Sequence, residues 1–551
     1  AQGCSGPLTS NMTWFVVLAH FWKQLLLVLV LTLGGGNCAE LLRDAFPDIL
    51  PFPGHQGSGA FSDLGAWHGF ALPADADSAG GFEGPFVHGQ WLPGHWLSPR
   101  SLVRFSPGGA ASEDGASRLQ AHFVPGALRQ GYSLGTLKVD SQLVFVGPRT
   151  AAVRIHASNA GGGALAFTMA FDGVAHSTLQ TTGSGVRSLF NAAQPDAIVE
   201  VLFDPVLGLK PQATGLTYRA AATPQVLHPA EEIVAYYTIS LALNASEQIA
   251  AQRVSEAFFG APDTYFRASE KLWENYLSSV VGSVGASGPS LHQRLVAKAL
   301  STLVLNWRGA TGSRLLHDGC TPSITVFSNG FWAWDSWKQA AALSAFDAGL
   351  AAQQVLAMFD YQGRQVGEAY AGMIPDKIGM PPDVGENWGN TKPPLAAWAV
   401  SIVYASGKDS QFLRDMFPRL EAYHQWWYRW RDHDGNGLCE FGATGNNLQG
   451  MKWESGMDNA PRFDNTTLLM NMDQAWSADQ ESVDLNSFLY AEKLILAAMA
   501  ARLENATKAA AYQREAGELR EKIQQRFFDE DSGYFFDRQL GTSGAFLGPM
   551  A

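Results

Sequence analysis

Acidic and aromatic side chains gather in the stretch KWESGMDNAPRF, residues 452–463. Glu454 and Asp458 stand four positions apart, the spacing that places two side chains on one face of a helix. Gly456 and Pro461 disfavour an uninterrupted helix here, so we expect a rigid loop. Two carboxylates beside aromatic walls suit cleavage of a sugar, which needs one acid to protonate the leaving oxygen and a second to activate water or attack.

Two other stretches supply similar residue types, and we call 329–338, 385–398 and 452–463 the first, second and third loops. The first loop, NGFWAWDSWK, places Asp335 at a helix start between two Trp residues. The alternative for Asp335 is a helix N-cap beside core aromatics. The second loop, GENWGNTKPPLAAW, precedes a Pro-Pro helix start and has a plain helix-initiating turn as its alternative. For the acids of the third loop, the alternative is solvated carboxylates or caps.

A fourth stretch, RDHDGNGLCEFG at 431–442, has the order D-x-D-x-N-G-x-x-E. Alternating oxygen donors around a glycine suit Ca²⁺, but the glutamate comes at the ninth position, so this is not an EF-hand. An Asn-Gly turn with solvated acids explains the stretch equally well. We therefore expect no required cofactor and a possible structural Ca²⁺. The candidate ligands are Asp432, Asp434, Asn436, the Leu438 carbonyl, Glu440 and Glu481.

The elements that position these loops are predicted to be helices. Apolar residues recur at helical spacing from residue 290 onward. The predicted helices cover 291–307, 334–346, 349–362, 393–406, 411–431, 482–504 and 506–528. Long loops rich in Trp, Gly, Asn and Asp join several of them, and such loops on a rigid scaffold often carry function.

The preceding part of the chain reads as strands. Between about residue 55 and residue 245, short alternating or apolar runs are separated by Gly, Pro and Asp, which predicts a β-sandwich. Helical spacing returns at 247–285. The domains predicted are a leader-like segment at 1–40, a β-sandwich at 41–246, a helical linker at 247–289 and a helical domain at 290–551.

Composition supports a folded chain of two or more domains. The 551 residues are 46% hydrophobic and 16% charged, with a net charge of −13. Nucleic-acid binding normally needs a basic stripe, so this class is excluded. Oligomeric state is not indicated. The 17 Trp residues suit stacking on sugar rings, and core packing explains most of them as well.

The N-terminal segment resembles a secretory signal. A short apolar run, Leu25–Leu33, is followed by small residues, and sequons stand at Asn244, Asn465 and Asn505. We expect a glycoprotein that is secreted or lies in the endomembrane lumen. The alternative is an uncleaved signal anchor and a type II membrane protein. Residues 1–11 precede the first plausible start and are excluded from fold reasoning.

Four cysteines, Cys4, Cys38, Cys320 and Cys439, allow one disulfide between the two that survive removal of a signal, and they do not indicate a sulfur-based metal site.

Four runs together resemble glycoside hydrolase family 63, especially its bacterial-type glucosidase and mannosylglycerate hydrolase branch. The runs are WAWDSWK, NTKPPLAAWAV, ESGMDNAPRF and SVDLNSFLYAEK, in that order. The aspartate-bearing runs are also similar to the trehalase pattern. The resemblance covers about 290–540 strongly and the β-rich half more loosely. It implies an N-terminal β-supersandwich followed by an (α/α)6 barrel.

The resemblance also implies roles for individual residues. Asp458 takes the place of the general acid, and Asp335 that of the aspartate that grips hydroxyls of the sugar being cleaved. Arg462 offers planar donors to a hydroxyl or a carboxylate. The implied substrate-binding residues are Trp334, Asp335, Asn387, Trp388, Lys392, Trp453, Glu454 and Arg462.

Inversion needs a general base, which in the resembled family is a glutamate far beyond the acid. This sequence ends too soon after Asp458 to include it, and the predicted helices are too few for six pairs. We therefore expect an incomplete barrel in a truncated chain without its base. Glu386 and Glu454 are the nearest substitutes.

The implied function is an inverting glycosidase that releases α-linked glucose or a related sugar from oligosaccharides. The alternatives are a non-catalytic carbohydrate-binding protein and an endomembrane glucosidase that trims N-linked glycans. An oligosaccharide is the expected partner, and a membrane only if the leader is an uncleaved anchor.

Overall fold

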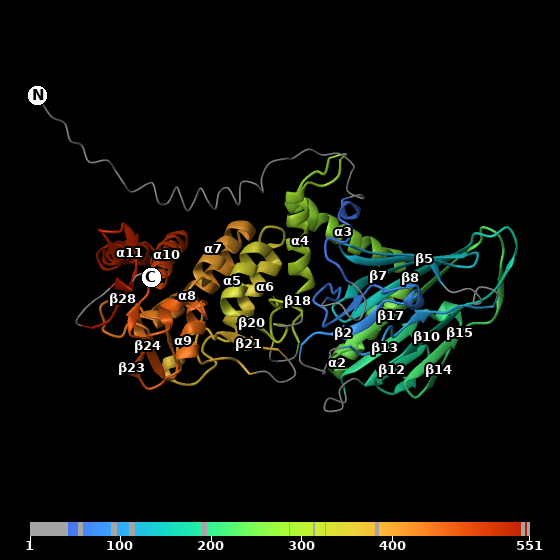
Figure 1. The fold of residues 1–551 in the computed structure, drawn as a ribbon, viewed down its shortest axis with the longest axis horizontal. Coiled ribbons are helices and arrows are strands. Elements are labelled where there is room, and N and C mark those ends of the chain that lie inside the picture. Colours follow the sequence, from blue (N-terminus) through green and yellow to red (C-terminus); the bar gives the residue numbers. More distant parts are fainter. Residues whose placement is uncertain are drawn as a thin grey trace, which may run out of the picture.

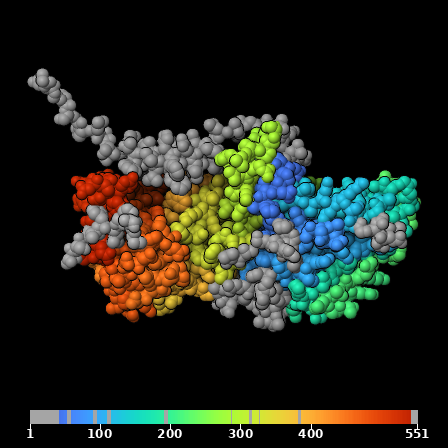
Figure 2. Space-filling model, in the orientation of Figure 1, coloured from blue at the N-terminus to red at the C-terminus, as the bar shows by residue number. Residues whose placement is uncertain are grey.

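The computed structural model describes residues 42–52, 59–89, 96–109, 116–189, 196–285, 287–311, 315–324, 327–380, 385–541 and 546–547. The predicted leader, Cys4 and Cys38 lie outside these residues. Sheets form one end of an elongated molecule and helices the other (Figures 1 and 2). Within the described residues, no helix combines the length and the apolar composition that a membrane crossing requires.

An eight-stranded antiparallel sheet dominates the N-terminal half, in the order β11-β12-β13-β17-β8-β7-β6-β5. Alternation along β7 buries Leu137 and Val139 and exposes Lys138 and Asp140, as expected for a sheet with one face on a core. The bounds are β5 Ser117–Val124, β6 Ala127–Leu134, β7 Leu137–Gly147, β8 Thr150–Asn159, β11 Leu179–Thr181, β12 Gly185–Leu189, β13 Ile198–Phe203 and β17 Glu232–Ala242.

Smaller sheets complete this half. The Phe171 ring, on β10, lies 5.1 Å from the Phe203 ring and 5.6 Å from the Tyr237 ring of the large sheet, so the two sheets share one core. The predicted β-sandwich is thus observed as two facing sheets. Their strands are β1 His68–Ala71 with β2 Glu83–Val87, then β3 Arg104–Phe105, β10 Ala170–Val174, β14 Lys210–Thr214 and β15 Thr217–Ala221, and finally β4 Gly108–Gly109, β9 Leu165–Thr168 and β16 Gln225–Leu227.

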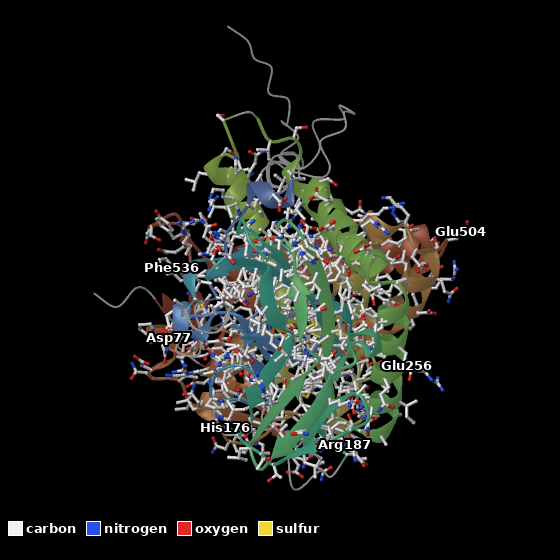
Figure 3. All side chains as sticks on the ribbon, turned by 90° about the vertical axis from the view of Figure 1, so that its right-hand side faces the viewer. Asp77, His176, Arg187, Glu256, Glu504 and Phe536 are labelled. Carbon is white, nitrogen blue, oxygen red and sulfur yellow. The ribbon has the colours of Figure 1, made fainter. Side chains whose placement is uncertain are left out.

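Two helices, α2 (Ala245–Gly260) and α3 (Pro262–Val281), pack on the opposite face of the large sheet. Phe258 and Phe266 are buried there against small apolar strand residues. Figure 3, viewed from the sheet end, shows Glu256 of α2 beside the sheet and Arg187 of β12 near its edge. The helical linker expected at 247–289 therefore covers part of the sheet.

Helix pairs build the C-terminal half. α5 packs on α6, α7 contacts α5, α6, α8 and α10, and α10 packs on α11 (Figure 1). The seven predicted helices are confirmed with ends shifted by a few residues. The bounds are α4 Leu291–Leu305, α5 Ala333–Leu343, α6 Ala348–Phe359, α7 Ala396–Gly407, α8 Ser410–Trp430, α9 Leu448–Ser455, α10 Val483–Arg502 and α11 Ala506–Phe527.

Short strands join these helices. They are β18 Trp307–Arg308 with β19 Gly319–Cys320, β20 Gly330–Trp332 with β21 Lys377–Gly379, β22 Gly442–Ala443 with β24 Ala475–Ala478 and β23 Leu468–Met472, β25 Gln480–Glu481 with β28 Asp537–Gln539 and β29 Phe546–Leu547, and β26 Phe528–Asp529 with β27 Tyr534–Phe535. An (α/α)6 barrel remains a prediction, as do the domain boundaries.

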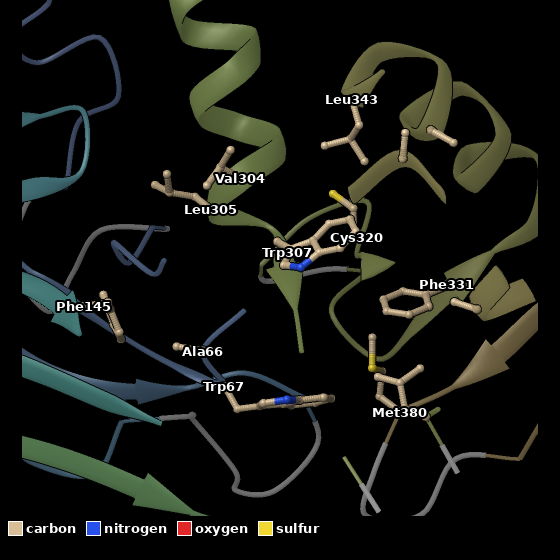
Figure 4. Close-up of a cluster of buried hydrophobic side chains, with 14 of the residues drawn as sticks. Ala66, Trp67, Phe145, Val304, Leu305, Trp307, Cys320, Phe331, Leu343 and Met380 are labelled. Carbon is tan, nitrogen blue, oxygen red and sulfur yellow. The ribbon is translucent and has the colours of Figure 1, made fainter. Parts of the chain in front are cut away.

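A continuous core joins the halves at the end of α4 (Figure 4). Trp67, from the sheet half, is fully buried, and its Nε1 donates to the Gly309 carbonyl at 2.9 Å. Arg308 donates to the Ala66 carbonyl at 3.1 Å. Hydrogen bonds from two large buried side chains therefore tie the sheets to the helices.

The disulfide considered for Cys320 and Cys439 is wrong. Both thiols are free and buried. Cys320 Sγ donates to the Leu303 carbonyl at 3.4 Å, and burial raises the pKa of the Cys320 thiol to about 12. These cysteines therefore behave as small core residues.

Candidate active site

The first loop enters the helical half through the pairing of β20 with β21. Trp332 stands opposite Lys377, and α5 begins at the next residue, Ala333. The Ala333 N–H donates to the carbonyl oxygen of Asp376 at 2.9 Å. This pairing fixes the start of α5 and, with it, Asp335 in the first helical turn.

Asp335 is partly buried and does not cap the helix. Trp332 occupies the N-cap position and makes no side-chain capping hydrogen bond. The N-cap alternative for Asp335 is therefore wrong. Burial raises the pKa of Asp335, while the ammonium groups of Lys338 and Lys392 act in the opposite direction. The Asp335 carboxylate is thus partly shielded from water and interacts electrostatically with two ammonium groups.

The second loop is arranged around Lys392. Its ammonium lies 3.2 Å from Asp376 Oδ1, and both side chains are almost fully buried. Asn387 Nδ2 donates to Asp376 Oδ2 at 2.8 Å. Burial raises the pKa of Asp376, and Lys392 and Asn387 act in the opposite direction. The sequence predicts that Lys392 binds sugar; in the structure its charge is balanced by Asp376 within the protein.

The third loop is half helix and half loop. α9 carries Trp453 and Glu454, and Gly456 ends it in the left-handed region with a φ of 69°. A Cβ added to Gly456 would lie 2.3 Å from the Trp334 ring, so only glycine allows the first and third loops to approach this closely. Lys392 of the second loop donates to the Trp453 carbonyl.

The three loops therefore meet around the Trp334 ring. Lys338 Nζ lies 3.4 Å and Lys392 Nζ 5.9 Å from the ring centre, both within the range of cation–π attraction. The charge of Asp458 also raises the pKa of Asp376, so these two carboxyl groups interact electrostatically. Segments more than a hundred residues apart thus bring carboxylates, ammonium groups and an indole to one place.

The face of this cluster is accessible. Trp453 is 39% exposed, and Trp334, Asn387 and Trp388 are partly exposed. Asp458 is exposed, and no hydrogen bond or ion pair engages its carboxylate among the residues that the structure describes. A ligand that reaches the cluster would meet aromatic surface and an unpaired acid together.

Glu454 is not accessible. It is fully buried, and Arg431 donates to both of its carboxylate oxygens, at 2.7 and 2.9 Å. The backbone N–H groups of Gly442 and Thr391 donate to the same oxygens at 2.7 and 3.1 Å. The structure therefore corrects the interpretation of Glu454 as a substrate contact or substitute base. Glu454 instead ties α9 to the second loop and to β22.

Arg462 is also engaged by carboxylates of the protein. Its guanidinium donates to Asp484 at 2.7 and 3.2 Å and to Asp537 at 3.0 Å, and it lies 4.5 Å from the centre of the Phe463 ring. The sequence predicts a contact from Arg462 to the substrate. In the structure Arg462 instead anchors the segment after Asp458 to α10 and β28.

Residues 328–549 match the family described as the mannosylglycerate hydrolase MGH1-like glycoside hydrolase domain, and residues 51–196 match the N-terminal domain of glucosidase YgjK. The first match contains all three loops and the second contains most of the sandwich. Together the two matches support this chain as a member of glycoside hydrolase family 63.

Curated relatives of this chain are similar over part of their length. A mannosylglycerate hydrolase of Thermus thermophilus is 31% identical over 194 residues, 30% of this chain and 40% of the relative. A trehalase of Dictyostelium discoideum is 25% identical over 276 residues, 41% of this chain and 44% of the relative. The chain spans less than half the length of these curated relatives.

A solved family 63 structure also aligns with this chain. It is a mannosylglycerate hydrolase from Thermus thermophilus in complex with Tris, with 22% identity and a TM-score of 0.35 over 44% of this chain and 68% of the other. Because this TM-score is low, residue positions in that structure are not assigned to residues of this chain.

We expect Gly456→Ala to disturb the meeting of the loops. The left-handed backbone disfavours a side chain by about 1–2 kcal/mol, and the new Cβ also overlaps the Trp334 ring. Chemical denaturation should show a lower free energy of unfolding and Trp fluorescence a shifted emission. Gly445→Ala is the matched control, because no atom lies within 4 Å of its Cβ position. Equal stability of the two variants would contradict the packing described.

The 431–442 stretch brings three acids together. Oxygens of Asp432, Asp434 and Glu440 lie within 4.8 Å of one another. Asp432 Oδ1 and Glu440 Oε1 are buried without a hydrogen-bond partner. Burial raises the pKa of both carboxyl groups, and repulsion by neighbouring acids acts in the same direction. Two buried acceptors without donors are the chemistry that a hard cation would satisfy.

The remaining predicted metal ligands are less well placed. Asn436 Nδ2 donates to Glu481 Oε1 at 2.7 Å, and Arg526 donates to Glu481 Oε2 at 2.5 Å. Both Glu481 oxygens are therefore occupied, and Glu481 lies outside the group of three acids, which corrects its assignment as a ligand. Asn436 Oδ1 accepts from the Leu438 N–H at 2.7 Å. The Leu438 carbonyl as a ligand stays a prediction.

Sequence reasoning did not identify Asp376, Arg431, Asp484 and Asp537 as residues that shape the site. Asp376 pairs with Lys392, Arg431 with Glu454, and the other two with Arg462. Asp484 lies within the quoted run SVDLNSFLYAEK, so its position in the first turn of a predicted helix was a usable signal. The other three have no local pattern, because their partners are distant in sequence.

Proposed function

We propose that this chain forms the part of a glycoside hydrolase in which Asp458 protonates the departing oxygen of an α-linked sugar, and that the reaction proceeds with inversion. The observation that supports this most is the meeting of three Trp-flanked loops around Trp334. Membership of family 63 supports hydrolysis of a glycoside as the reaction class.

The surroundings of each residue suggest a different role in the reaction. Asp458 is exposed and unpaired in the described structure, so its carboxyl group is able to approach a bound ligand. Asp335, next to Trp334 in the chain, would accept hydrogen bonds from sugar hydroxyls. Lys392 and Asp376 hold each other at 3.2 Å and keep the second loop against the third. Preorganised groups of this kind lower a barrier because they need not reorient during the reaction.

The proposal assigns only the proton-donating half of the reaction. Asp376 is ion-paired and Glu454 has both oxygens occupied, so neither is placed to accept a proton from water. An inverting enzyme holds its base roughly 6.5–9.5 Å from its acid, across the sugar ring. Product stereochemistry, followed by proton NMR of the newly released anomer, tests inversion directly.

The substrate is tested with a protein that contains this chain and any further residues that its gene encodes. We expect hydrolysis of aryl α-glucosides, trehalose or mannosylglycerate, since the similar relatives are described as a trehalase and mannosylglycerate hydrolases. Release of free sugar identifies the preferred glycoside. If the protein binds these compounds and cleaves none of them, it is a carbohydrate-binding protein and the hydrolase proposal is wrong.

We also propose that Asp432, Asp434 and Glu440 hold a structural Ca²⁺. The ion would supply positive charge to two buried acceptors and tie the end of α8 to the strand β22. It has no part in the chemistry at Asp458. The fit rests on the 4.8 Å grouping of the three acids and on the unsatisfied oxygens of Asp432 and Glu440.

Chelation should lower the melting temperature if the Ca²⁺ is present. A ligand at one hundred times its Kd adds about 2.7 kcal/mol to folding, so a shift of several degrees is expected on adding EDTA and reversal on adding CaCl₂. Asp434→Asn should reduce this shift. Asp473→Asn, an exposed acid outside the cluster, is the control. Identical melting curves with and without EDTA would rule out the site.

A further inference from the structure

The outer face of the large sheet changes from apolar to polar beyond α2 and α3. Val124, Val144 and Ala152 pack under the two helices against Phe258 and Phe266. The next residues on the same face of β5, β6, β7 and β8 are polar or glycine, and those of β17 are Tyr236 and Val234. A groove with a volume of about 510 Å³ lies along them.

Two rows of side chains cross five strands in register to form this groove. Adjacent strands lie about 4.8 Å apart, so the five strands span roughly 20 Å, enough for several sugar rings. The row nearer the helices consists of His122, Arg129, Gln142, Arg154 and Tyr236. The second row consists of Gln120, Gly131, Asp140, His156 and Val234.

Gly131, the second of the five residues in the second row, has no side chain and leaves a hollow there. Its neighbours across the strands are Gln120 and Asp140, and a Cβ built on it would lie 2.9 Å from Asp140 Oδ1. A glycine inside a strand has no side chain to pack against its neighbours, and it often marks a place where another molecule approaches closely. The hollow is therefore lined by polar atoms.

The side chains around the hollow hold one another in position. Arg154 donates to Gln142 Oε1 at 3.0 Å, and its guanidinium lies 4.5 Å from the centre of the Phe266 ring and 3.5 Å from Asp263 Oδ1. Gln142 is only 8% exposed, and its Nε2 has no hydrogen-bond partner in the described structure. A buried amide donor without an acceptor at the wall of a polar groove is the kind of group that a ligand satisfies.

Charge in the groove is balanced. Among the lining side chains, the positive charges of Arg129 and Arg154 are matched by the negative charges of Asp140 and Asp263. A strongly anionic or cationic ligand would meet no excess of opposite charge. A neutral ligand rich in hydroxyl groups would meet donors, acceptors and the aromatic side chain of Tyr236 along one line.

We propose that this groove binds a neutral oligosaccharide, at a site separate from the one around Trp334. The groove spans the β17-to-β5 part of the large sheet, whereas the three loops belong to the helical half. It would hold a glycan chain without cleaving it. The proposal goes beyond the proposed hydrolase activity and does not depend on it.

The test uses the Asp458→Asn variant, so that binding is measured without turnover. Isothermal titration with maltoheptaose and with mannohexaose should detect binding to at least one of them. Adding Gly131→Tyr, which fills the hollow, or Gln142→Ala, which removes the amide, should weaken that binding by about tenfold or more, or 1.4 kcal/mol. Arg187→Ala, an exposed change on β12 of the same sheet, should leave it unaltered.

Three results would overturn the proposal. The first is that neither neutral oligosaccharide binds. The second is that binding survives Gly131→Tyr and Gln142→Ala but is lost with Trp334→Ala, which would place the sugar only at the loops. The third is that an acidic oligogalacturonide binds more tightly than both neutral chains. Thermal melts check that each variant folds, and Gln142→Ala tests the groove even if Gly131→Tyr is unstable. Loss of hydrolysis without loss of groove binding would count against the hydrolase proposal alone.

Discussion

Replacing Asp458 with Asn is expected to reduce kcat for glycoside hydrolysis by about 10²–10⁴-fold, the usual contribution of a general acid. The amide keeps the size of the side chain but cannot give a proton to the leaving oxygen. Because Asp458 is exposed and unpaired in the described structure, the substitution removes no packing and no ion pair. Steady-state kinetics on the preferred glycoside measure the loss, and the melting temperature should stay unchanged.

Asp464→Asn is the matched control for this variant. Asp464 is another exposed acid of the same segment, and it pairs with Lys452 at 3.3 Å. It should retain nearly full activity. An activated aryl glycoside, whose leaving group needs less protonation, should suffer less from Asp458→Asn than an unactivated disaccharide does. If Asp458→Asn cleaves both substrates at the wild-type rate, Asp458 is not the acid.

Arg431→Met is expected to be the most destabilising single substitution at this site. It leaves the fully buried carboxylate of Glu454 without its charged partner, and breaking a buried pair from one side costs about 3–5 kcal/mol. Urea unfolding should show this loss. The second loop should also loosen, because Glu454 holds the Thr391 N–H at 3.1 Å.

Two comparisons separate this explanation from simple loss of an arginine. Arg429→Met removes an exposed pair with Glu368 at 3.5 Å and should change stability by less than about 1 kcal/mol. The double variant Arg431→Met/Glu454→Met removes both charges and should be more stable than Arg431→Met alone. If the double variant is instead the less stable of the two, the buried charge is not the cause.

Much of the fold follows from local sequence pattern. The helices at 291–307, 411–431 and 506–528 appear with nearly the predicted ends, because their apolar stripes and their capping residues agree. The third loop is different. α9 is short, and its Asn447 cap and Gly456 end are hard to distinguish from turn residues in the sequence. Gly456 and Pro461 do break the helix as predicted.

The candidate site was predictable by residue type and much less by role. Trp334, Asp335 and Asp458 stand in short motifs, so sequence places them near helix starts and turns. Whether a charged residue faces the protein or a ligand depends on partners far away in the chain. Glu454 and Arg462 look like binding residues locally, but Arg431 and Asp537 occupy them. No local pattern predicts such long-range pairs.

These pairs also explain how an exposed acid is held in place. The segment on either side of Asp458 is tied to the protein, by Glu454 before it and by Arg462 after it. Gly456 against Trp334 fixes the distance to the first loop. The acid itself stays unpaired in the described structure while its neighbours are anchored, which is the arrangement that a positioned proton donor needs.

A crystal structure of the Asp458→Asn protein with its preferred glycoside bound tests the central claim most directly. We predict that the sugar lies against Trp334, with its glycosidic oxygen about 3 Å from the amide of residue 458. One of its hydroxyl groups should donate a hydrogen bond to Asp335. A glycoside that is bound away from Trp334, with its glycosidic oxygen facing neither residue 458 nor Asp335, would contradict the account.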